Sequence, residues 1–584
     1  MLTNLIIRNF KRFGRAEIEL GNPVVFIGPN DSGKTTALQA LALWYIGLQV
    51  WIEKRGGRET PEKRPGVTIN RRDLVSVPVP DANLLWRDLH VRDVRTVDGK
   101  PHTDNIRMDI VVNGVSLGKV WECGFEFDYA NPESFYCRPL RLSETKNPER
   151  MAVPEEAADV RVSFLPPMSG LAANETRLDP GAVNVRLGEG RTAEVLRNLC
   201  YQVYTNNGSN GWDRLSERIR ELFGVRLDAP EYVKERGEVT MTYRSPNGVR
   251  LDLSSSGRGL QQTLLLLSYM FVNPKSALLL DEPDAHLEIL RQRQIYQLLS
   301  DTAKEQDSQI IAASHSEVVL NEAADRDVVI AFVGRPHRID DRGSQVLKSL
   351  REIGLEQYYE AEQTGFVLYL EGATDLAILR EFAKTLQHQA ARILERPFVH
   401  YVQNHIAGAR GHFYGLREAK PDLVGAGIYD RTDFVLQTEP SFRERMWRRR
   451  EIENYLCQPE TLMAHAEASA IETSAGSLFA APEIERRRAA MDRCIRDLVP
   501  PIALRDRSDP WWSETKASDD FLDRVFESFY AELGLPNMMR KTDYHVLAQL
   551  VPLNLIDPEV REMLDLILEV TAQAQPTAIN EAVE

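Results

Sequence analysis

Residues 23–36 read Pro23-Val24-Val25-Phe26-Ile27-Gly28-Pro29-Asn30-Asp31-Ser32-Gly33-Lys34-Thr35-Thr36. The apolar run is typical of a buried strand, the Gly/Pro/Asn/Asp segment of a turn, and the apolar residues that follow of a helix. The pattern G-x-x-x-x-G-K-[ST] is present in full. A chance glycine turn rarely has all three parts in this order, so the stretch predicts a phosphate-binding loop.

These residue types suit a nucleoside triphosphate. Glycines at 28 and 33 let backbone N–H groups curl around phosphates, and the helix N-terminus adds positive dipole. Lys34 is expected to reach the β- and γ-phosphates, and the Thr35 hydroxyl to bind Mg²⁺. The predicted nucleotide-binding residues of this loop are Gly28, Asn30, Gly33, Lys34, Thr35 and Thr36.

Length and composition restrict the number of domains and the type of protein. A chain of 584 residues predicts two to four domains, and 43% hydrophobic with 27% charged residues is ordinary for soluble protein. No uninterrupted apolar run reaches roughly 18 residues, the N-terminus lacks a signal-peptide layout, and the five cysteines form no C-x-x-C pair. We expect a cytoplasmic protein without a membrane partner. The net charge of −15 argues against a general basic coat for nucleic acid but leaves a local groove open.

Several segments alternate like β-strands. Residues 5–10 and 16–20 predict a hairpin that leads into the phosphate-loop strand. Residues from about 48 to 165 have no phosphate motif and predict an antiparallel β insertion. Within it, residues 105–127 predict a β-hairpin with its turn at Asn113-Gly114, because that dipeptide favours tight hairpin turns.

Three more motifs follow in a fixed order. A Ser/Gly turn opens an apolar helix at residues 253–262, an apolar strand ends in Asp281-Glu282, and another strand ends near His315. Considered alone, the Ser/Gly turn is more often a helix cap than a ligand-binding segment, and a single histidine is more often structural than catalytic. Two adjacent carboxylates at a buried strand tip are more specific, because they need a cation or water.

With the phosphate loop, this order resembles the ATP-binding-cassette ATPases, in particular the SMC-like branch that includes the OLD (overcoming lysogenization defect) family. The resemblance implies that Asp281 supports Mg²⁺, that Glu282 polarises the attacking water, and that His315 senses the γ-phosphate. It places Asp284 in the D-loop.

Ser256, Gly257 and Gly259 resemble the signature segment, which completes the nucleotide site of a second subunit in that family. The resemblance therefore implies a homodimer or higher homo-oligomer through the ATPase domain. The segment reads Ser-Ser-Gly-Arg-Gly in place of Leu-Ser-Gly-Gly-Gln, and no Q-loop glutamine is identified. No long heptad arm precedes it, which disfavours an arm-bearing SMC protein.

Acidic residues recur at predicted strand ends in the C-terminal part. A strand ends at Glu371-Gly372 with Asp375 in the next turn, a second ends at Asp430, and Glu453 follows a basic run. The carboxyl ends of neighbouring parallel strands meet at one sheet edge, and clustered carboxylates suit Mg²⁺ or Mn²⁺. Two such ions can activate water and stabilise the leaving oxygen of a phosphodiester.

This segment resembles a Toprim domain, the metal-binding fold of topoisomerases, primases and OLD nucleases. By that resemblance, the predicted metal ligands are Glu371, Asp375, Asp430, Asp433 and Glu453, and Lys541 stabilises the phosphate. The second acid of the D-x-D motif is replaced by Thr432, and Asp433 comes one residue later. Asp433 substitutes, or the site uses one metal, or the nuclease is impaired.

The chain is thus expected to be α/β. Residues 1–345 form an ABC-type ATPase with the β insertion, 346–364 a connector, and 365–584 a Toprim domain, a Rossmann-like parallel sheet with additional helices. The family resemblance implies an ATP-gated, Mg²⁺- or Mn²⁺-dependent DNA endonuclease in anti-phage defence, with a second defence protein as a partner. Its implied catalytic residues are Glu282, His315, Glu371, Asp430 and Lys541. Two alternatives stay open: an ATPase sensor or scaffold whose altered Toprim site is inactive on DNA or acts on RNA, and a chromosome-maintenance ATPase without its own nuclease.

Overall fold

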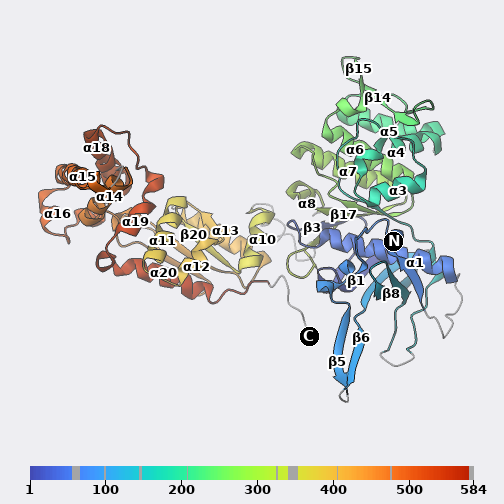
Figure 1. Cartoon of the computed structure of the whole chain (residues 1–584), viewed down its shortest axis with the longest axis horizontal. Helices are drawn as coiled ribbons and strands as arrows, with labels where there is room; N and C mark the ends of the chain where they lie inside the picture. Colours follow the sequence, from blue (N-terminus) through green and yellow to red (C-terminus); the bar gives the residue numbers. More distant parts are fainter. Residues whose placement is uncertain are drawn as a thin grey trace. The chain divides into compact units, whose positions relative to one another are not determined.

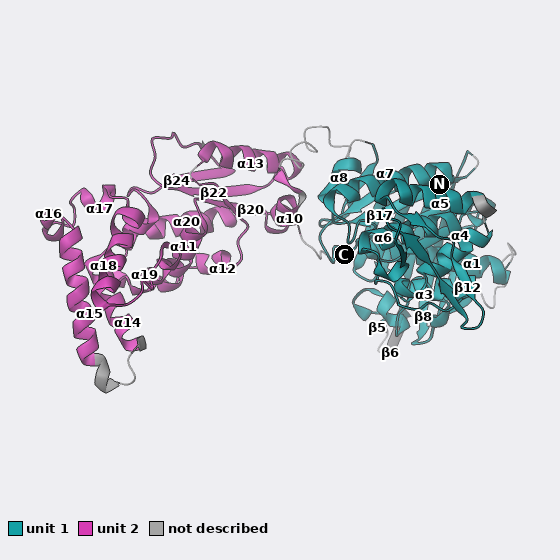
Figure 2. Cartoon of the chain, turned by 90° about the horizontal axis from the view of Figure 1, so that it is seen from above, with its two compact units in different colours: residues 1–347, 579–584 teal, residues 348–578 magenta. Residues whose placement is uncertain are grey.

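The computed structural model divides into two compact units, residues 1–347 with 579–584 (unit 1) and residues 348–578 (unit 2) (Figure 2). The structure describes residues 1–55, 66–97, 100–116, 118–143, 148–206, 208–323, 326–339, 353–403, 405–473 and 477–577. The predicted domain exit at 334–344 and the predicted connector at 346–364 lie partly outside these residues.

The N-terminal hairpin is confirmed, and it continues into the strands that were expected to form a separate insertion. β1 pairs antiparallel with β2, with Leu5 opposite Ile18, and on its other side with β7. The resulting antiparallel sheet has the order β2 (Phe13–Glu19), β1 (Leu2–Phe10), β7 (Met108–Ser116), β8 (Lys119–Asn131), β9 (Ser134–Pro139) and β4 (Val67–Asn70). The strands around residues 67–139 are therefore part of the same sheet as the N-terminus.

The predicted turn of the β7–β8 hairpin is wrong. Asn113 and Gly114 lie inside β7, where Gly114 pairs with Trp121, and the last strand pair before the turn is Ser116 with Lys119. A Cβ on Gly114 would come within 2.2 Å of the Trp121 ring. This glycine serves close packing against an indole, so the Asn-Gly preference for turns does not apply here.

A second, mostly parallel sheet carries the phosphate loop. Its order is β10 (Val162–Leu165), β16 (Ala277–Asp281), β17 (Gln309–Ser314), β3 (Val24–Ile27), β18 (Val328–Ala331) and β19 (His337–Arg338), with only β19 antiparallel to its neighbour among these strands. β10 thus belongs to this sheet, although the sequence assigned its residues to the end of the insertion. The order places the carboxyl ends of β16, β17 and β3 side by side.

Helix α1 (Lys34–Arg55) contacts strands of both sheets and lies in their shared core (Figure 1). It is long and apolar enough to cross a membrane by length and composition, but 56% of its most apolar window is buried inside the protein. Ala37, Leu41 and Trp44 are fully buried against this core. Packing between two sheets therefore accounts for its apolar composition.

The opposite face of the parallel sheet is covered by helices. Leu264 and Leu267 of α6 share a core with Leu278 of β16 and Ile310 of β17. The remaining helices of unit 1 are α2 (Glu155–Ala158), α3 (Pro180–Gly188), α4 (Leu196–Asn206), α5 (Gly208–Phe223), α6 (Arg258–Val272), α7 (Ile289–Glu305) and α8 (Glu317–Ala323). Small sheets are formed by β5 (Arg92–Val97) with β6 (Lys100–Asn105), by β11 (Arg226–Leu227), β14 (Thr242–Arg244) and β15 (Arg250–Asp252), and by β12 (Glu231–Val233) with β13 (Glu238–Thr240).

Unit 2 is built on a five-stranded sheet between helices. Its order is β21 (Val399–Tyr401), β20 (Phe366–Leu370), β22 (Val424–Tyr429), β24 (Phe442–Met446) and β23 (Thr438–Glu439), and all neighbours except β23 and β24 run parallel. Leu368 faces the core with α11 and α20, whereas Tyr369 packs on Phe413 of α13. The helices are α10 (Leu355–Thr364), α11 (Ala373–Thr385), α12 (Ala390–Glu395), α13 (Ile406–Ala419), α14 (Pro459–Thr473), α15 (Ser477–Leu498), α16 (Pro501–Arg505), α17 (Trp511–Glu514), α18 (Asp523–Leu533), α19 (His545–Leu550) and α20 (Pro558–Thr571).

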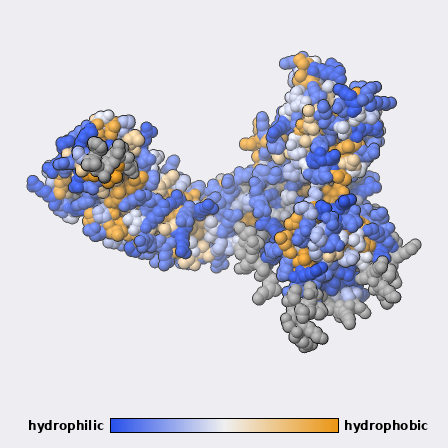
Figure 3. All heavy atoms as spheres, viewed as in Figure 1, coloured by the Kyte–Doolittle hydropathy of each residue, from blue (hydrophilic) through white to orange (hydrophobic). Residues whose placement is uncertain are grey.

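The surface in view is mostly hydrophilic in both units, with apolar residues scattered in small groups (Figure 3). This distribution agrees with the 27% charged residues of the sequence.

Candidate functional site

The phosphate loop connects β3 to α1 through residues 28–33. Gly33 has a positive φ of 106°, and a Cβ there would come within 2.8 Å of the Phe13 ring and 2.9 Å of Arg12. At Gly28, a Cβ would come within 2.7 Å of the Ser32 hydroxyl. Both glycines of the motif are thus required by the backbone path as well as by the ligand expected there.

Lys34 lies within the curve of this loop. Its residue is 5% exposed, and its Nζ donates hydrogen bonds of 2.7 Å to the carbonyl oxygens of Gly28 and Pro29. Burial lowers the pKa of Lys34, while the carboxylates of Glu282 and Asp281 oppose that shift. The ammonium is therefore held where the β- and γ-phosphates of a bound nucleotide are expected.

Thr35 and Asp281 meet directly although 246 positions separate them in the chain. The Thr35 hydroxyl contacts both carboxylate oxygens of Asp281, at 3.0 and 2.9 Å. Burial and the nearby Glu282 raise the pKa of Asp281 to about 6, against the Thr35 hydrogen bond and Lys34. A hydroxyl beside a buried carboxylate whose charge is incompletely balanced is a donor set that fits Mg²⁺.

Glu282 and His315 stand at the ends of adjacent strands β16 and β17. The backbone N–H of Glu282, which has a positive φ of 49°, donates to the Ala313 carbonyl at 2.9 Å. The Glu282 carboxylate lies 3.6 Å from His315 Nδ1, and both side chains are accessible to solvent. The structure therefore brings together the two residues that sequence assigned to water activation and γ-phosphate sensing.

Asp284, which was assigned to the D-loop, is buried behind these two residues. Burial raises its pKa, against a hydrogen bond from Ser314. Its Oδ1 atom finds no hydrogen-bond partner among the described residues.

The signature segment forms a turn before α6. Asp252 caps the short helix η5 (Leu253–Ser255), and the Ser256 hydroxyl donates to the Leu253 carbonyl at 2.7 Å. Gly257 is the N-cap of α6, and nothing lies within 4 Å of the position where its Cβ would be. The first turn of α6 is thus open at the residues that resemble the signature.

In unit 2, four acids gather at the carboxyl edge of the parallel sheet. Glu371 follows β20 and Asp430 follows the adjacent strand β22. Asp375, in the first turn of α11, accepts a hydrogen bond from the Glu371 backbone N–H at 3.2 Å. Glu453, in the short helix η7 (Ile452–Tyr455), is 4% exposed and completes the group.

Burial and the neighbouring acids raise the pKa of Asp375, Asp430 and Glu453. Burial, a hydrogen bond with Glu371 and the charges of Asp375 and Glu453 all raise the pKa of Asp430. Burial and Glu371 raise the pKa of Asp375 to about 6, and burial, Glu451 and Asp375 raise that of Glu453 to about 8. The site therefore gathers more negative charge than its surroundings neutralise.

The donor chemistry fits hard divalent cations, which prefer carboxylate oxygens. Within the described residues, however, no three Asp, Glu, His or Cys side chains are arranged as ligands of one ion. Glu371 and Asp430 hydrogen-bond to each other instead. Asp433 is exposed in the loop after β22, whereas Asp375 and Glu453 are buried, and its role as a metal ligand stays a prediction.

Two lysines flank this acidic group. Lys541 donates to the Ser518 hydroxyl at 3.2 Å, lies 3.8 Å from Asp519, and lowers the pKa of Glu453. Lys516 also pairs with Asp519, and the nearby charges of Glu451 and Glu371 help to raise its pKa. A π-helix at Ala517–Leu522 holds Ser518 and Asp519 between the two ammonium groups. Sequence reasoning identified only Lys541, because nothing in the local pattern distinguishes Lys516.

Two protein-family models match parts of unit 1. Residues 1–45 match a model described as "AAA ATPase domain", and residues 206–321 match one described as "AAA domain, putative AbiEii toxin, Type IV TA system". The first match includes the phosphate loop, and the second includes the signature turn, Asp281, Glu282 and His315. Unit 1 thus contains an ATPase domain of the AAA/ABC type, which binds and hydrolyses nucleotide.

Among curated proteins, the DNA replication and repair protein RecF of Rickettsia canadensis (strain McKiel) is 43% identical to this chain over 47 residues. That match covers 8% of this chain and 13% of the RecF sequence, so the chain spans only a small part of this relative's length.

Solved structures of SMC heads give low similarity scores. The SMC head domain from Thermotoga maritima has a TM-score of 0.30 at 18% identity, covering 58% of this chain and 98% of that one. The Pyrococcus furiosus Smc head domain with an extended coiled coil, bound to the C-terminal domain of ScpA, has a TM-score of 0.34 at 13% identity, covering 60% and 99%. Scores of this size carry no conclusion about fold or function.

Proposed function

We propose that this protein is an ATP-gated, metal-dependent DNA endonuclease of the OLD kind, in which unit 1 hydrolyses ATP and unit 2 is a Toprim domain that cleaves phosphodiesters. The observation that carries the nuclease assignment is the gathering of Glu371, Asp375, Asp430 and Glu453 at the carboxyl edge of one parallel sheet. Acids in this position are typical of sites that handle divalent ions and phosphates.

In unit 1, different residues bind the phosphates of ATP, bind Mg²⁺ and activate the attacking water. Lys34 exchanges its two carbonyl partners for the β- and γ-phosphate oxygens, and Thr35 with Asp281 would hold Mg²⁺, which neutralises phosphate charge. Glu282 accepts a proton from the attacking water, and His315 beside it contacts the γ-phosphate. The open turn at Ser256, Gly257 and Gly259 completes the nucleotide site of a second copy, which makes the protein a homodimer or larger homo-oligomer.

In unit 2, Glu371, Asp375, Asp430 and Glu453 would hold Mg²⁺ or Mn²⁺, which supplies charge neutralisation and lowers the pKa of a bound water. Lys541 and Lys516 bind the non-bridging oxygens of the phosphodiester, because both ammonium groups are exposed beside the acids. Asp519 pairs with both lysines and is the anion that the phosphate replaces.

The choice of DNA as substrate rests on two supports. One is the segment similar to a protein named for DNA replication and repair. The other is the OLD resemblance, which also implies a role in anti-phage defence in the cytoplasm, with a second defence protein as a further partner.

A second function is favoured by a specific observation. Thr432 stands where the Toprim motif has its second acid, Asp433 is exposed, and no three acids of the described residues converge on one point. The second candidate is therefore an ATPase sensor or scaffold whose acidic site does not cut DNA or acts on RNA.

Cleavage of plasmid DNA by the purified chain, with ATP and either Mg²⁺ or Mn²⁺, separates the two. We expect cleavage that is lost in Glu371→Ala and kept in Asp433→Ala, a matched acid on the exposed loop. No cleavage of DNA by the folded, ATP-hydrolysing wild type under any metal condition would contradict the nuclease. Cleavage of RNA alone would favour the second candidate.

A further inference from the structure

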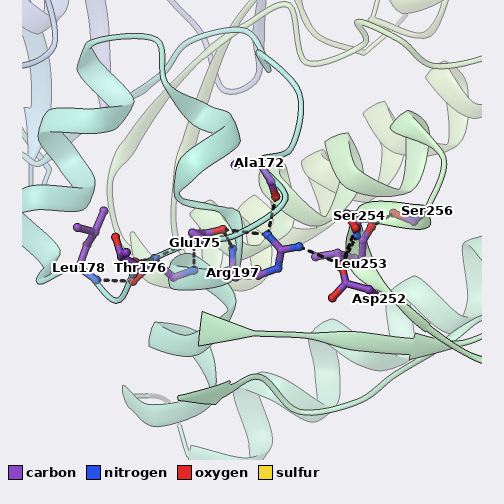
Figure 4. A network of polar contacts seen from close by, with 10 residues as sticks. Ala172, Glu175, Thr176, Leu178, Arg197, Asp252, Leu253, Ser254 and Ser256 are labelled. Carbon is purple, nitrogen blue, oxygen red and sulfur yellow. Dashed lines mark hydrogen bonds and ion pairs between the residues drawn. The ribbon is translucent and has the colours of Figure 1, made fainter. Parts of the chain in front are cut away.

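A buried arginine lies behind the signature turn. Arg197, the second residue of α4, is 1% exposed. Its Nη1 donates to the Ala172 carbonyl at 2.9 Å, and its Nη2 donates to Asp252 Oδ1 at 3.1 Å (Figure 4). The guanidinium thus connects the interior of the helical layer to the residue that precedes the signature turn.

An arginine at this position does not stabilise helix α4. A cation in the first turn of a helix is unfavourable, because the helix dipole places positive charge there. The buried carboxylate of Glu175 satisfies the helix end instead, since it accepts from the backbone N–H groups of Arg197 at 2.9 Å and Asn198 at 2.6 Å. Capping of the backbone N–H groups therefore does not use the guanidinium, which lies 3.8 Å from the buried Glu175 carboxylate and also pairs with Asp252.

Asp252 in turn organises the signature segment. Its Oδ1 accepts from the Ser254 backbone N–H at 2.8 Å and from the Ser254 hydroxyl at 2.6 Å, while the Ser255 hydroxyl bonds to its carbonyl at 2.6 Å. Partial burial raises the pKa of Asp252, but the Ser254 hydrogen bonds and Arg197 outweigh it and lower the pKa overall. One carboxylate oxygen is thus shared between Arg197 and the turn.

We propose that Arg197 is a positioning residue for the signature turn: it fixes Asp252 so that Ser256, Gly257 and the first turn of α6 are presented to the nucleotide of a second copy of this chain. This inference rests on the proposed completion of the ATP site across a dimer. It adds a residue of α4, far from the signature in sequence, to the machinery of ATP hydrolysis.

The energetics favour a role in geometry over a role in stability. Asp252 is half-exposed, with 48% of its side chain accessible, so the pair gains little from a low dielectric at that end. Replacing a whole buried ion pair is often neutral for stability, although removing one partner is destabilising, and the best-supported use of such groups is to specify one arrangement. Here the arrangement is that of the turn between β15 and α6. Arg197→Met also leaves the buried Glu175 without its cation, so Asp252→Asn is the variant that isolates the contact to the turn.

The test compares Asp252→Asn, Arg197→Met and the double variant with the full-length wild type. Asp252→Asn keeps an oxygen acceptor for Ser254 but removes the charge that faces Arg197. Asp228→Asn is the matched control, because Asp228 also pairs with arginines, Arg244 and Arg250, beside the same small sheet without capping the turn. For each variant, nucleotide affinity, ATP-dependent self-association, kcat and thermal unfolding are measured.

We expect Asp252→Asn and Arg197→Met each to lower kcat and ATP-dependent self-association by about tenfold, the size of one charge-assisted hydrogen bond. Nucleotide affinity stays at the wild-type value, since the phosphate loop is untouched, and the double variant is no worse than either single variant. Arg197→Lys restores part of kcat. A purely structural role would lower the unfolding temperature and shift affinity and kcat together.

Two results overturn the inference in distinguishable ways. If wild-type specific ATPase activity does not rise with protein concentration, the dimer proposal fails and this inference fails with it. If it does rise, and folded Asp252→Asn has wild-type kcat and self-association, the inference alone is wrong.

Discussion

Both units place acids at the carboxyl ends of parallel strands, but the acids have opposite surroundings. In unit 1, Asp281 accepts from the Thr35 hydroxyl and lies near the Lys34 ammonium. In unit 2, Asp430 hydrogen-bonds to another acid, Glu371, and the neighbouring Asp375 and Glu453 are acidic as well. The same strand-end geometry thus holds an acid with a hydroxyl donor and a nearby lysine in one unit, and an acid surrounded by other acids in the other.

This difference separates two ways of preparing a phosphate site. Unit 1 offers fixed donors, the loop N–H groups and a lysine, to an anion. Unit 2 offers concentrated negative charge, which repels a phosphate unless cations come between them. A nucleotide should therefore stabilise unit 1, whereas the first ligand of unit 2 should be a divalent ion.

The largest expected effect tests the independence of the two sites. Lys34→Ala removes the main side-chain partner of the β/γ-phosphates, so we expect ATP affinity to fall at least about a hundredfold. Calorimetric titration with a non-hydrolysed ATP analogue measures it, and titration with Mn²⁺ in the same variant should give the wild-type result for unit 2.

Lys11→Ala is the matched control, because Lys11 is another lysine that bonds to α1, through Gln39 at 2.6 Å. Wild-type ATP affinity in Lys34→Ala would contradict the assignment of the phosphate loop.

The second prediction concerns the cations that unit 2 itself supplies. Lys516→Ala and Lys541→Ala should each lower the DNA cleavage rate by about 10- to 100-fold, because each removes a positive charge beside the reacting phosphate. The measurement is single-turnover plasmid cleavage in Mn²⁺. Lys384→Ala, an exposed lysine of the same unit that pairs with Glu381, should cleave at the wild-type rate. Full activity in Lys516→Ala would leave Lys541 as the only lysine of the site.

The sequence predicted the features that are encoded by residues close together in the chain, and it did not predict those that depend on contacts between distant residues. The phosphate loop and Asp281-Glu282 are contiguous patterns, and strand-end position alone predicted that Glu371 and Asp430 would meet. The turn of the β7–β8 hairpin was predicted at the wrong residues. Gly114 leaves space for the Trp121 ring on the neighbouring strand, and the sequence of β7 alone does not reveal that contact.

Lys516 and Arg197 were missed for a related reason. Each acts through partners that are distant in the chain, Glu371 for the first and Asp252 for the second, and neither lies in a motif. Asp433 was predicted as a substitute ligand from its nearness to Asp430 in sequence, and it is exposed in the structure. A residue's distance in sequence from a strand end is therefore a weak predictor of whether its side chain lies at the edge of the sheet.

The third prediction tests the unbalanced charge directly. Asp430→Asn should raise the free energy of unfolding of unit 2 by about 1–3 kcal/mol in EDTA at neutral pH, since the amide is always neutral and can donate to Glu371, whereas the raised pKa of Asp430 means that the folded state must hold a proton that the unfolded chain releases. It should also abolish the rise in unfolding temperature that Mn²⁺ produces in the wild type. Calorimetric unfolding with and without Mn²⁺ measures both, with Asp433→Asn as the exposed control. Destabilisation by Asp430→Asn in EDTA would show that the acids do not repel one another.

The prediction with the smallest effect tests whether the pH dependence of the unfolding free energy of unit 2 comes from its acids alone. His412 of α13 is half-buried and hydrogen-bonds through Nδ1 to the Tyr369 hydroxyl at 2.8 Å and through Nε2 to Gln357 of α10 at 2.6 Å. Its ring stacks on His400 at 3.8 Å. Burial and the neighbouring His400 lower the pKa of His412 to about 3, whereas the unfolded chain should titrate near the ordinary value of about 6.5.

Between these two pKa values the unfolded state binds the proton and the folded state does not. Stability therefore falls as pH decreases below about 6.5, by at most about 1.4 kcal/mol per pH unit for this group. His412→Phe cannot take up the proton, so the gap in unfolding free energy between wild type and variant should be largest at pH 7.5 and shrink toward pH 4.5. Urea unfolding across this range measures the gap, with His545→Phe as a control, because the Nδ1 of His545 contacts the Thr542 carbonyl at 3.0 Å in an exposed position. Parallel curves for wild type and His412→Phe would assign the whole acid sensitivity of unit 2 to groups other than this histidine, and the contrast between the two units would then rest on the carboxylates alone.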